Sequence, residues 1–370
     1  MLCRGQKGSH GLMSPAHQGP DQDATKDGGA GSMTPRTQQR WARRRKLVSS
    51  LLIMFLALAC APAKVRAGPA PPDGRCYLID TDVEIDDVRA VGMLARTGRV
   101  AAVVVTEGIS RTPEGVGALR EVLRRGGQDG IPVIRGASPN PKWPEQLGPD
   151  LQTWRANAER LNHLLEAPIP AADPPTADIA EALRPMLAAC RRISVLVIGP
   201  WTSFLRYAAE VLERVDRIIA QGRPYPDELT GQPEGFNCRY DLDSCFATFD
   251  LLVGRQQRAD RRVRTAWVDI PNGLERCRTA EPGVDDNGRQ LYAFRPVPEW
   301  IEALAQEKHM APVIAAMLRA NPEGWEKTSL WDDLAALYLL RPDVFAARGG
   351  HQQPCVSAAT IRDMLTTALA

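Results

Sequence analysis

The chain has 370 residues, of which 44% are hydrophobic and 24% charged, and these ordinary globular values exclude a fibrous, collagen-like or wholly disordered chain. Its 46 Lys and Arg nearly balance its 44 Asp and Glu, but the balance is uneven. Residues 1–67 carry 11 basic and 3 acidic side chains, whereas the remainder carries 35 and 41. The mildly acidic remainder argues against a nucleic-acid binder held by phosphate contacts, and it suits a bound cation.

Residues 1–67 are predicted to form a leader that precedes a single domain at 68–370. Residues 1–32 are rich in Gly, Gln, Asp and Ser and lack apolar periodicity, which predicts disorder. Met33 is an alternative start for the same chain. The predicted fold and function therefore concern residues 68–370.

The second half of the leader has the pattern of an export signal. A basic run at 43–46 precedes an apolar stretch at 47–62, which is shorter than the roughly 20 residues of a membrane-spanning helix. Val65-Arg66-Ala67, which ends in a small residue, offers a cleavage site before Gly68. We expect an exported protein, periplasmic or secreted, with no membrane span after processing. A retained N-terminal anchor, a lipid anchor at Cys60 and a twin-arginine signal are the alternatives.

The cysteines of the predicted mature chain form no metal-binding pattern. No two of them make a CxxC pair, which argues against a zinc ribbon or a thioredoxin-like site. An even number in an oxidising compartment permits disulfides, and the nearest pair is Cys238 and Cys245. Disulfides and buried free thiols both fit the spacing. The six residues are Cys76, Cys190, Cys238, Cys245, Cys277 and Cys355.

The domain is predicted to be α/β, a single open, mostly parallel (Rossmann-like) sheet with helices on both faces and a helical C-terminal third. Short β-branched runs predict strands, and helical periodicity predicts the segments between them. The predicted strands are Cys76–Ile79, Val100–Thr106, Ile131–Ile134, Ile193–Ile198, Ile218–Ala220 and Val263–Ile270. The predicted helices are Val88–Arg96, Gly115–Arg125, Ala177–Cys190, Phe204–Val215, Cys245–Gly254, Glu299–Gln306, Met310–Arg319 and Leu330–Leu340. Surface loops are predicted at Pro168–Pro175 and Gly222–Gly235.

Five carboxylates lie within eight residues directly after the first predicted strand, in Asp80-Thr81-Asp82-Val83-Glu84-Ile85-Asp86-Asp87. Crowded like charges are unfavourable unless a cation or a helix N-terminus compensates them. Asp86 and Asp87 fall on the first turn of the next predicted helix, where the helix dipole favours negative charge. Asp82 and Asp87 can converge on one ion, and hard oxygen ligands select Ca²⁺ or Mg²⁺. A solvated acidic turn is the alternative.

This stretch resembles the N-terminal signature of the inosine-uridine-preferring nucleoside hydrolase family, Asp-Thr-Asp-Pro-Gly-Ile-Asp-Asp. Three further segments are similar to family motifs and occur in the family's order. Val197–Ser203 resembles the Leu-Gly-Pro-Leu-Thr-Asn turn, and Glu234–Asn237 with Asp241 resembles the Glu-Phe-Asn…Asp-Pro segment. Leu330–Pro342 resembles the C-terminal His-Asp-Pro-Leu-Ala segment and the Leu-Leu-x-Pro that follows it.

The resemblance covers nearly the whole predicted domain, from about residue 77 to 345. It implies a Ca²⁺-dependent hydrolase of N-glycosidic bonds that releases the base from ribonucleosides or acts on a related ribosyl substrate. Members of the family often form dimers or tetramers, so a homo-oligomer is an open alternative to a monomer.

The family's Ca²⁺ site maps onto Asp82, Asp87, Asp332 and the backbone carbonyl of Thr202. Asp82 also matches the general base, which takes a proton from the attacking water. In this resemblance one carboxylate therefore both holds the metal and accepts the proton.

The family's substrate contacts map onto three further residues. Asp86 and Asn237 match residues that bind ribose hydroxyls. Trp331 stands where some members carry a His that protonates the leaving base, and where purine-preferring members stack the base on a Trp. The resemblance therefore makes Trp331 the candidate for base stacking.

Three departures from the family pattern leave other functions open. Val83-Glu84 replaces Pro-Gly, Ile109 ends a segment where the family has Gly-Asn, and Gly235 stands where a ribose-contacting Glu is common. These changes suit a catalytically altered ribose- or nucleoside-binding protein.

A second alternative is a haloacid dehalogenase-like phosphatase, whose Asp-x-Asp-x-Thr/Val pattern fits 80–83 with Asp80 as the nucleophile. That fold also needs a lysine near the site. No lysine of the predicted domain follows a predicted strand, which disfavours a phosphatase.

Overall fold

The computed structural model describes residues 71–165, 178–222, 235–257, 263–269, 294–348 and 351–370. The chain divides into two units, Met1–Lys64 and Val65–Ala370, and all described residues lie in the second. The predicted leader, the predicted loop at Pro168–Pro175 and the interior of the predicted loop at Gly222–Gly235 lie outside the described residues.

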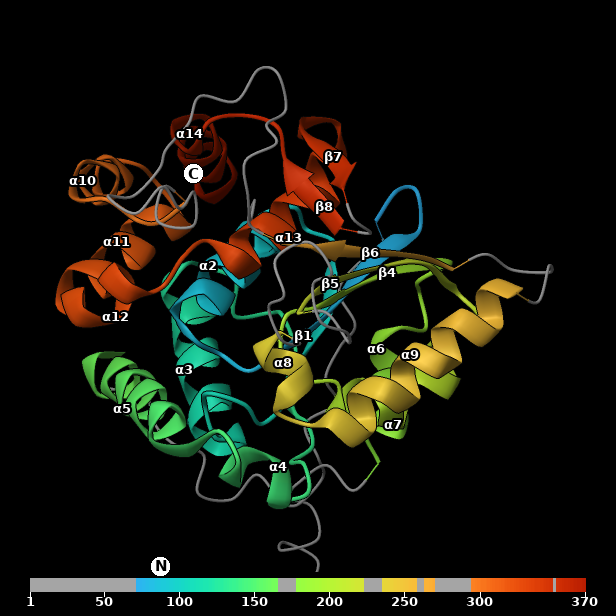
Figure 1. Cartoon of the computed structure of the whole chain (residues 1–370). Helices are drawn as coiled ribbons and strands as arrows, with labels where there is room; N and C mark the ends of the chain where they lie inside the picture. Colours follow the sequence, from blue (N-terminus) through green and yellow to red (C-terminus); the bar gives the residue numbers. More distant parts are fainter. Residues whose placement is uncertain (1–70, 166–177, 223–234, 258–262, 270–293, 349–350) are drawn as a thin grey trace, which may run out of the picture. The chain divides into compact units, whose positions relative to one another are not determined.

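The described strands form one eight-stranded sheet in the order β3-β2-β1-β4-β5-β6-β8-β7 (Figure 1). All neighbouring strands are parallel except β7 and β8. From β1 the chain fills β2 and β3 on one side and then crosses to β4 on the other, so the strand order reverses between β1 and β4. Ligands of such sheets bind outside the carboxyl ends of the strands at this reversal. The strands are β1 (Arg75–Thr81), β2 (Val100–Val105), β3 (Val133–Arg135), β4 (Arg192–Val197), β5 (Val215–Gln221), β6 (Arg264–Val268), β7 (Phe345–Arg348) and β8 (His351–Pro354).

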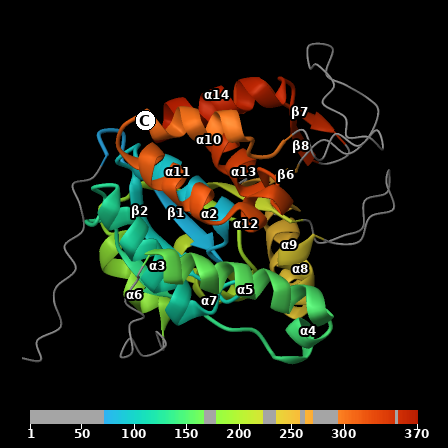
Figure 2. The same cartoon turned by 90° about the vertical axis from the view of Figure 1, so that its left-hand side faces the viewer.

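Helices cover both faces of the sheet (Figures 1 and 2). Successive strand side chains point to opposite faces, so Ile79 of β1 joins one core and Leu78 joins the other. The first core is completed by α2 (Ile85–Ala95), α3 (Thr112–Arg125), α10 (Pro298–Ala305), α11 (Met310–Ala320), α13 (Trp331–Leu340) and α14 (Ala358–Leu369). The second core is completed by α6 (Ile179–Met186), α7 (Thr202–Val211) and α9 (Leu242–Gln257).

The remaining helices pack around these layers. α5 (Gly148–Leu165) contacts α3, α11 and α12 (Pro322–Lys327), and α4 (Lys142–Glu145) precedes it. The short α8 (Phe236–Arg239) contacts α9. Within the described ranges, no helix combines the length and the apolar character needed to cross a bilayer.

The predicted α/β fold and all its predicted strands and helices are confirmed, with shifted ends. The predicted helix Ala177–Cys190 ends early, at Met186, one residue after the internal Pro185. The C-terminal third is less purely helical than predicted, because it also contains the β7–β8 pair. The sequence prediction missed α4, α5, α8, α12, α14 and these two strands.

All the described cysteines are in disulfides, so buried free thiols are the wrong alternative for them. Cys76 of β1 is bonded to Cys190, which precedes β4, and their Cα atoms are 5.6 Å apart. Cys238 of α8 is bonded to Cys245 of α9, with a Cα distance of 5.2 Å. Cys355 is disulfide-bonded as well. The second bond closes a short loop next to the predicted site residue Asn237.

Candidate active site

Three predicted site carboxylates come together beyond the carboxyl end of β1. Asp86 and Asp87 lie on the first turn of α2, and Asp332 lies on the first turn of α13. All three are buried, and each offers an oxygen within 4.8 Å of the others. Two helix N-termini therefore meet at this group, and their dipoles offset part of its negative charge.

Backbone donors hold Asp87 in place. Its Oδ1 accepts hydrogen bonds from the Thr81 hydroxyl and from the Asp82 N–H, the latter at 3.2 Å. Its Oδ2 accepts from the Glu84 N–H at 2.9 Å, which closes a capping box at the start of α2. Three residues at the end of β1 and in the turn before α2 therefore donate hydrogen bonds to the Asp87 carboxylate.

Asp86 has an oxygen without a partner. Its side chain is 3% exposed, and its buried Oδ1 accepts no hydrogen bond from any described residue. Burial, reinforced by the neighbouring Asp87, raises the pKa of Asp86 to about 7. Burial and the surrounding carboxylates likewise raise the pKa of Asp87 and of Asp332 well above the usual range.

In the part of the chain that the structure describes, one buried arginine lies beside this group, and it is already paired. Arg89, one turn further along α2, donates from Nε and Nη2 to the carboxylate of Asp333 at 2.9 and 2.8 Å. Both side chains are almost fully buried, at 0% and 1% exposure. The Arg89–Asp333 pair is close to neutral, so it supplies no positive charge to offset Asp86, Asp87 and Asp332 when they ionise. An unpartnered oxygen in an excess of buried carboxylates fits a hard cation such as Ca²⁺.

Asp82 lies beside this group rather than within it. Its Oδ2 accepts a hydrogen bond from the Ile109 N–H at 2.8 Å, in the loop that follows β2. Burial raises its pKa to about 7 against the effect of this bond, and the charges of Glu84 and Asp86 raise it further. A carboxylate with a pKa near the working pH is well placed to accept a proton.

The turn at Val83-Glu84 has its own geometry. Val83 has φ 56°, in the left-handed region that β-branched residues rarely adopt. Proline, whose ring fixes φ near −65°, does not fit this conformation. Glu84, where the family signature has glycine, directs its carboxylate to the Thr328 hydroxyl at 3.4 Å. The turn therefore departs from the family signature in sequence, and its backbone at Val83 does not accept the proline of that signature.

The remaining predicted residues lie along the same edge of the sheet. Thr202 begins α7, and its hydroxyl donates to Asp241 Oδ2 at 2.6 Å. The Asn237 amide nitrogen donates to the Ile198 carbonyl at 2.8 Å and to Gln221 Oε1 at 3.0 Å, so it is bound to the ends of β4 and β5. Trp331 begins α13, directly before Asp332, and is half-buried against the core.

Comparison with known proteins identifies the family. The sequence model of the inosine-uridine preferring nucleoside hydrolases matches residues 77–364. The chain belongs to this family. As a nucleoside hydrolase it is an enzyme that hydrolyses N-glycosidic bonds of nucleosides.

Solved structures of similar fold span most of the hydrolase. The effector protein XOO4466 is 17% identical with a TM-score of 0.51, and the match covers 80% of this chain and 92% of that one. The purine-preferring ribonucleoside hydrolase from Gardnerella vaginalis is 12% identical with a TM-score of 0.50, covering 80% and 98%. The type III effector protein XopQ, solved in complex with adenosine diphosphate ribose, is 17% identical with a TM-score of 0.50, covering 80% and 92%. No curated protein matches the chain.

The phosphatase alternative does not fit the nucleoside hydrolase structure. Asp80, its required nucleophile, is fully buried. One of its oxygens accepts from the Thr106 hydroxyl and the other from the Tyr207 hydroxyl at 3.0 Å. Asp80 therefore links the end of β1 to the residue after β2 and to α7. Because it is fully buried, a substrate cannot reach it.

Sequence reasoning missed several residues that shape the hydrolase site. Arg89 and Asp333 pair across 244 positions, and no local pattern in the sequence marks such a contact. Arg155 and Tyr240, which contact the loop after β2, were missed for the same reason. Asp241 did have a signal, because it belongs to a family-like segment, but its bond to Thr202 was not expected.

Proposed function

We propose that this nucleoside hydrolase requires Ca²⁺ and releases the base from ribonucleosides. The observation that carries the proposal is that Asp87 and Asp332, two of the proposed ligands, lie together with Asp86 in one buried group of carboxylates. When bound, Ca²⁺ supplies a lowered pKa for the attacking water and a fixed direction of attack. We assign its ligands to Asp82, Asp87, Asp332 and the Thr202 carbonyl.

The remaining roles follow from position and chemistry. Asp82, a buried carboxylate beside the group of Asp86, Asp87 and Asp332, accepts the proton of the attacking water. Asp86 and Asn237 bind the ribose hydroxyls. The transition state has oxocarbenium character, so the carboxylates beneath the sugar stabilise its positive charge.

Trp331 is assigned to stacking of the leaving base. It is half-buried at the start of α13, next to Asp332. The similarity in fold to a purine-preferring ribonucleoside hydrolase supports a preference for purine nucleosides.

Binding of a ribosyl ligand without catalysis is the second candidate. It is favoured by the altered turn after β1, where Val83 has φ 56° and Glu84 replaces the glycine of the family signature. The XopQ structure, which holds adenosine diphosphate ribose, supplies the chemical class of such a ligand.

Release of ribose from inosine, adenosine and uridine tests the proposal. We expect turnover with Ca²⁺, its loss after exhaustive chelation, and its return when Ca²⁺ is added back. Chelation should also lower the melting temperature by about 5 °C, because an ion at 100 times its Kd stabilises the folded state by about 2.7 kcal/mol. Asp87→Asn should abolish the thermal shift, whereas Asp343→Asn, at an exposed pair with Arg341, should retain it.

Two outcomes contradict the calcium-dependent hydrolase. Full activity in protein shown by elemental analysis to be metal-free removes the role of calcium. Absence of turnover, together with a Ca²⁺-dependent thermal shift on adding adenosine diphosphate ribose, favours the binding function.

A further inference from the structure

One peptide group lies between Asp82, the proposed base, and Arg155, an arginine that is largely buried. The Ile109 N–H donates to Asp82 Oδ2 at 2.8 Å on the inner side. The Gly108 carbonyl accepts from Arg155 Nη2 at 3.3 Å and from Nε at 3.4 Å on the outer side. This N–H and this carbonyl belong to the same planar amide. Arg155 and Asp82 therefore act on opposite ends of one rigid group.

Arg155 is itself firmly held. It projects from α5, and its Nη2 pairs with Glu107 Oε1 at 3.0 Å and also donates to the Tyr240 hydroxyl. Tyr240 donates in turn to the same Glu107 oxygen at 3.2 Å. The Arg155 and Glu107 side chains are only 20% and 23% exposed, so solvent screens the pair less than it screens a surface ion pair.

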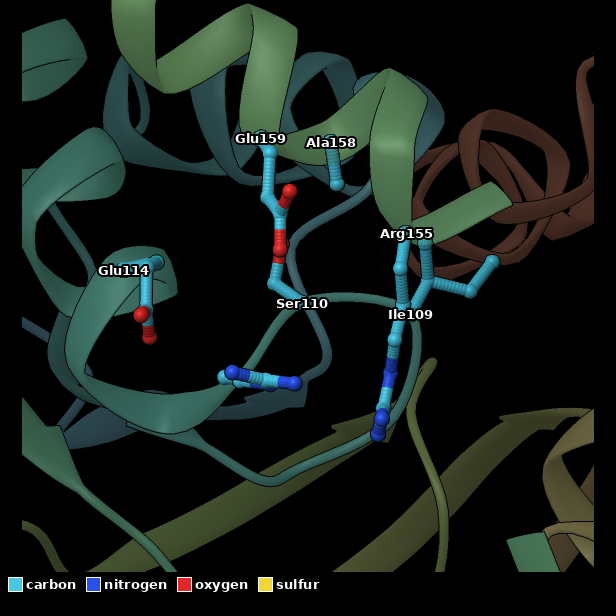
Figure 3. Close-up of a pocket in the computed structure, with 7 residues that line it drawn as sticks. Ile109, Ser110, Glu114, Arg155, Ala158 and Glu159 are labelled. Carbon is cyan, nitrogen blue, oxygen red and sulfur yellow. The ribbon is translucent and has the colours of Figure 1, made fainter. Parts of the chain in front are cut away.

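Several contacts hold the loop that contains this peptide. A small hollow separates α5 from the loop after β2, and Figure 3 shows Arg155 reaching from the helix past Ile109. Further along the loop, Ser110 is tied to the β1–α2 turn by its N–H to the Asp82 carbonyl at 3.0 Å and its hydroxyl to the Val83 carbonyl at 2.7 Å. These bonds hold the far end of the loop. Its near end is held by backbone bonds from the Glu107 N–H to the Ala137 carbonyl at 2.9 Å and from the Gly108 N–H to the Ser110 carbonyl at 3.2 Å. Arg155 is the side chain that holds the Gly108 carbonyl.

We propose that Arg155 is a positioning residue for the hydrolysis reaction. By holding the Gly108 carbonyl, it aims the Ile109 N–H at Asp82 and keeps that carboxylate in the geometry from which it accepts a proton. A cation on the carbonyl side also polarises the amide and strengthens the bond on the N–H side. The catalytic part of this proposal rests on the proposed role of Asp82.

Two substitutions at Arg155 and one matched control test the proposal. Arg155→Met removes the guanidinium and keeps the apolar stem, and Arg155→Lys keeps the charge. Arg120→Met removes an arginine that also donates to a backbone carbonyl, that of Val133 at 2.8 Å in β3, outside the site. With inosine as substrate and Ca²⁺ present, we expect Arg155→Met to lower kcat by about 10- to 100-fold, as for a misplaced catalytic group, with KM within about threefold. Arg155→Lys should recover part of kcat, and Arg120→Met should keep it.

Measuring Arg155→Met in an Asp82→Asn variant distinguishes a positioning role of Arg155 from a merely structural one. If Arg155 acts through Asp82, Arg155→Met has no further effect on kcat once Asp82 is asparagine, because the two changes interrupt one interaction. An equal loss of kcat in both backgrounds overturns the proposal. So does unchanged kcat in Arg155→Met.

Hydrogen exchange of segment 107–111 supplies a measurement that does not depend on activity. The Ile109 amide should exchange slowly in the unmodified protein and in Arg120→Met, and faster in Arg155→Met. Faster exchange supports the coupling even if the unmodified protein cleaves no nucleoside, in which case only the hydrolase function fails. Unchanged exchange overturns the inference about Arg155.

Discussion

Gly108 is the residue at which the site tolerates least change. A Cβ built there would lie 2.0 Å from Asp82 Oδ2 and 2.5 Å from Asp82 Cβ. Real Cβ atoms do not approach so closely, so a methyl group must push either the Asp82 carboxylate or the loop away. This close approach is why the loop after β2 needs glycine at 108.

We therefore expect Gly108→Ala to reduce kcat by about 100-fold, the scale of a displacement of about 1 Å at a catalytic group. Gly130→Ala is the matched control, because a Cβ at Gly130 meets no atom within 4 Å and should leave kcat unchanged. Steady-state kinetics with inosine measures both variants. Equal activity of Gly108→Ala and the unmodified protein would show that Asp82 is not confined by this loop.

Protonation of the site carboxylates should make Ca²⁺ binding depend on pH. Burial raises the pKa of Asp82 and of Asp86 to about 7, far above their value in the unfolded chain. In the metal-free protein their contribution to stability is therefore fully present below pH about 4 and lost as the pH rises through about 7. Calcium reverses this dependence, because it binds the ionised form.

Apparent Ca²⁺ affinity should rise between pH 6 and 8 by about tenfold for each carboxylate that must lose a proton. Isothermal titration with Ca²⁺ at pH 6, 7 and 8, in buffers of different ionisation enthalpy, measures both the affinity and the number of protons released. A constant affinity with no proton release would contradict the raised pKa values.

Local sequence patterns predict the carboxylates between β1 and α2 but not the other residues of the site. Asp82, Asp86 and Asp87 were predictable because a strand, a turn and a helix start place them together within a few residues. Asp332 was predictable only through the family resemblance, since it lies far along the chain. Arg155 was not predictable, because its role depends on where α5 packs.

At the scale of elements, prediction succeeded where burial leaves a periodic pattern. β1, β2 and β4 are mostly apolar runs buried on both faces, and their signal is strong. α14 was missed although it has a serine cap and buried residues four apart at 361, 365 and 369. β8, with the sequence His-Gln-Gln-Pro, has no apolar signal at all. It is a strand because β6 and β7 offer it hydrogen-bonding partners.

The Arg89–Asp333 pair links α2 and α13 inside the protein. These helices bring the site carboxylates together, and the pair is their buried polar link. Removing one partner leaves a charge buried without compensation, which usually destabilises a protein by about 3–5 kcal/mol. Arg89→Met should therefore destabilise the protein by that amount, and Arg89→Met/Asp333→Leu should recover most of it.

Urea unfolding in saturating Ca²⁺ measures these differences in the free energy of unfolding. Arg319→Met is the control, because Arg319 pairs with Glu302 on the surface, with side chains 44% and 65% exposed. Such exposed pairs contribute at most about 1 kcal/mol. If Arg89→Met unfolds no more easily than Arg319→Met, the buried pair does not hold the two helices together.

At the scale of the whole molecule, the disulfides and the leader point to the same compartment. The Cys76–Cys190 bond closes a separation of 114 residues, and in the loop-closure account such a bond stabilises a protein by about 4–5 kcal/mol. Disulfides of this kind persist in oxidising surroundings and are rare in the cytosol. We propose that the chain is exported before it folds into its oxidised form.

Export predicts where the mature chain begins. The basic run at 43–46 and the apolar stretch at 47–62 should direct the full-length chain across the membrane, and cleavage after Ala67 should leave Gly68 as the first residue. N-terminal sequencing of the exported protein, made from the full-length chain in a bacterial host, checks this. Neutralising the basic run with glutamine should retain the protein inside the cell with its leader uncut and with free thiols. A membrane-bound product that starts at a lipid-modified Cys60 supports the lipid anchor instead, and an exported product that starts within the first forty residues contradicts a signal peptide ending at Ala67.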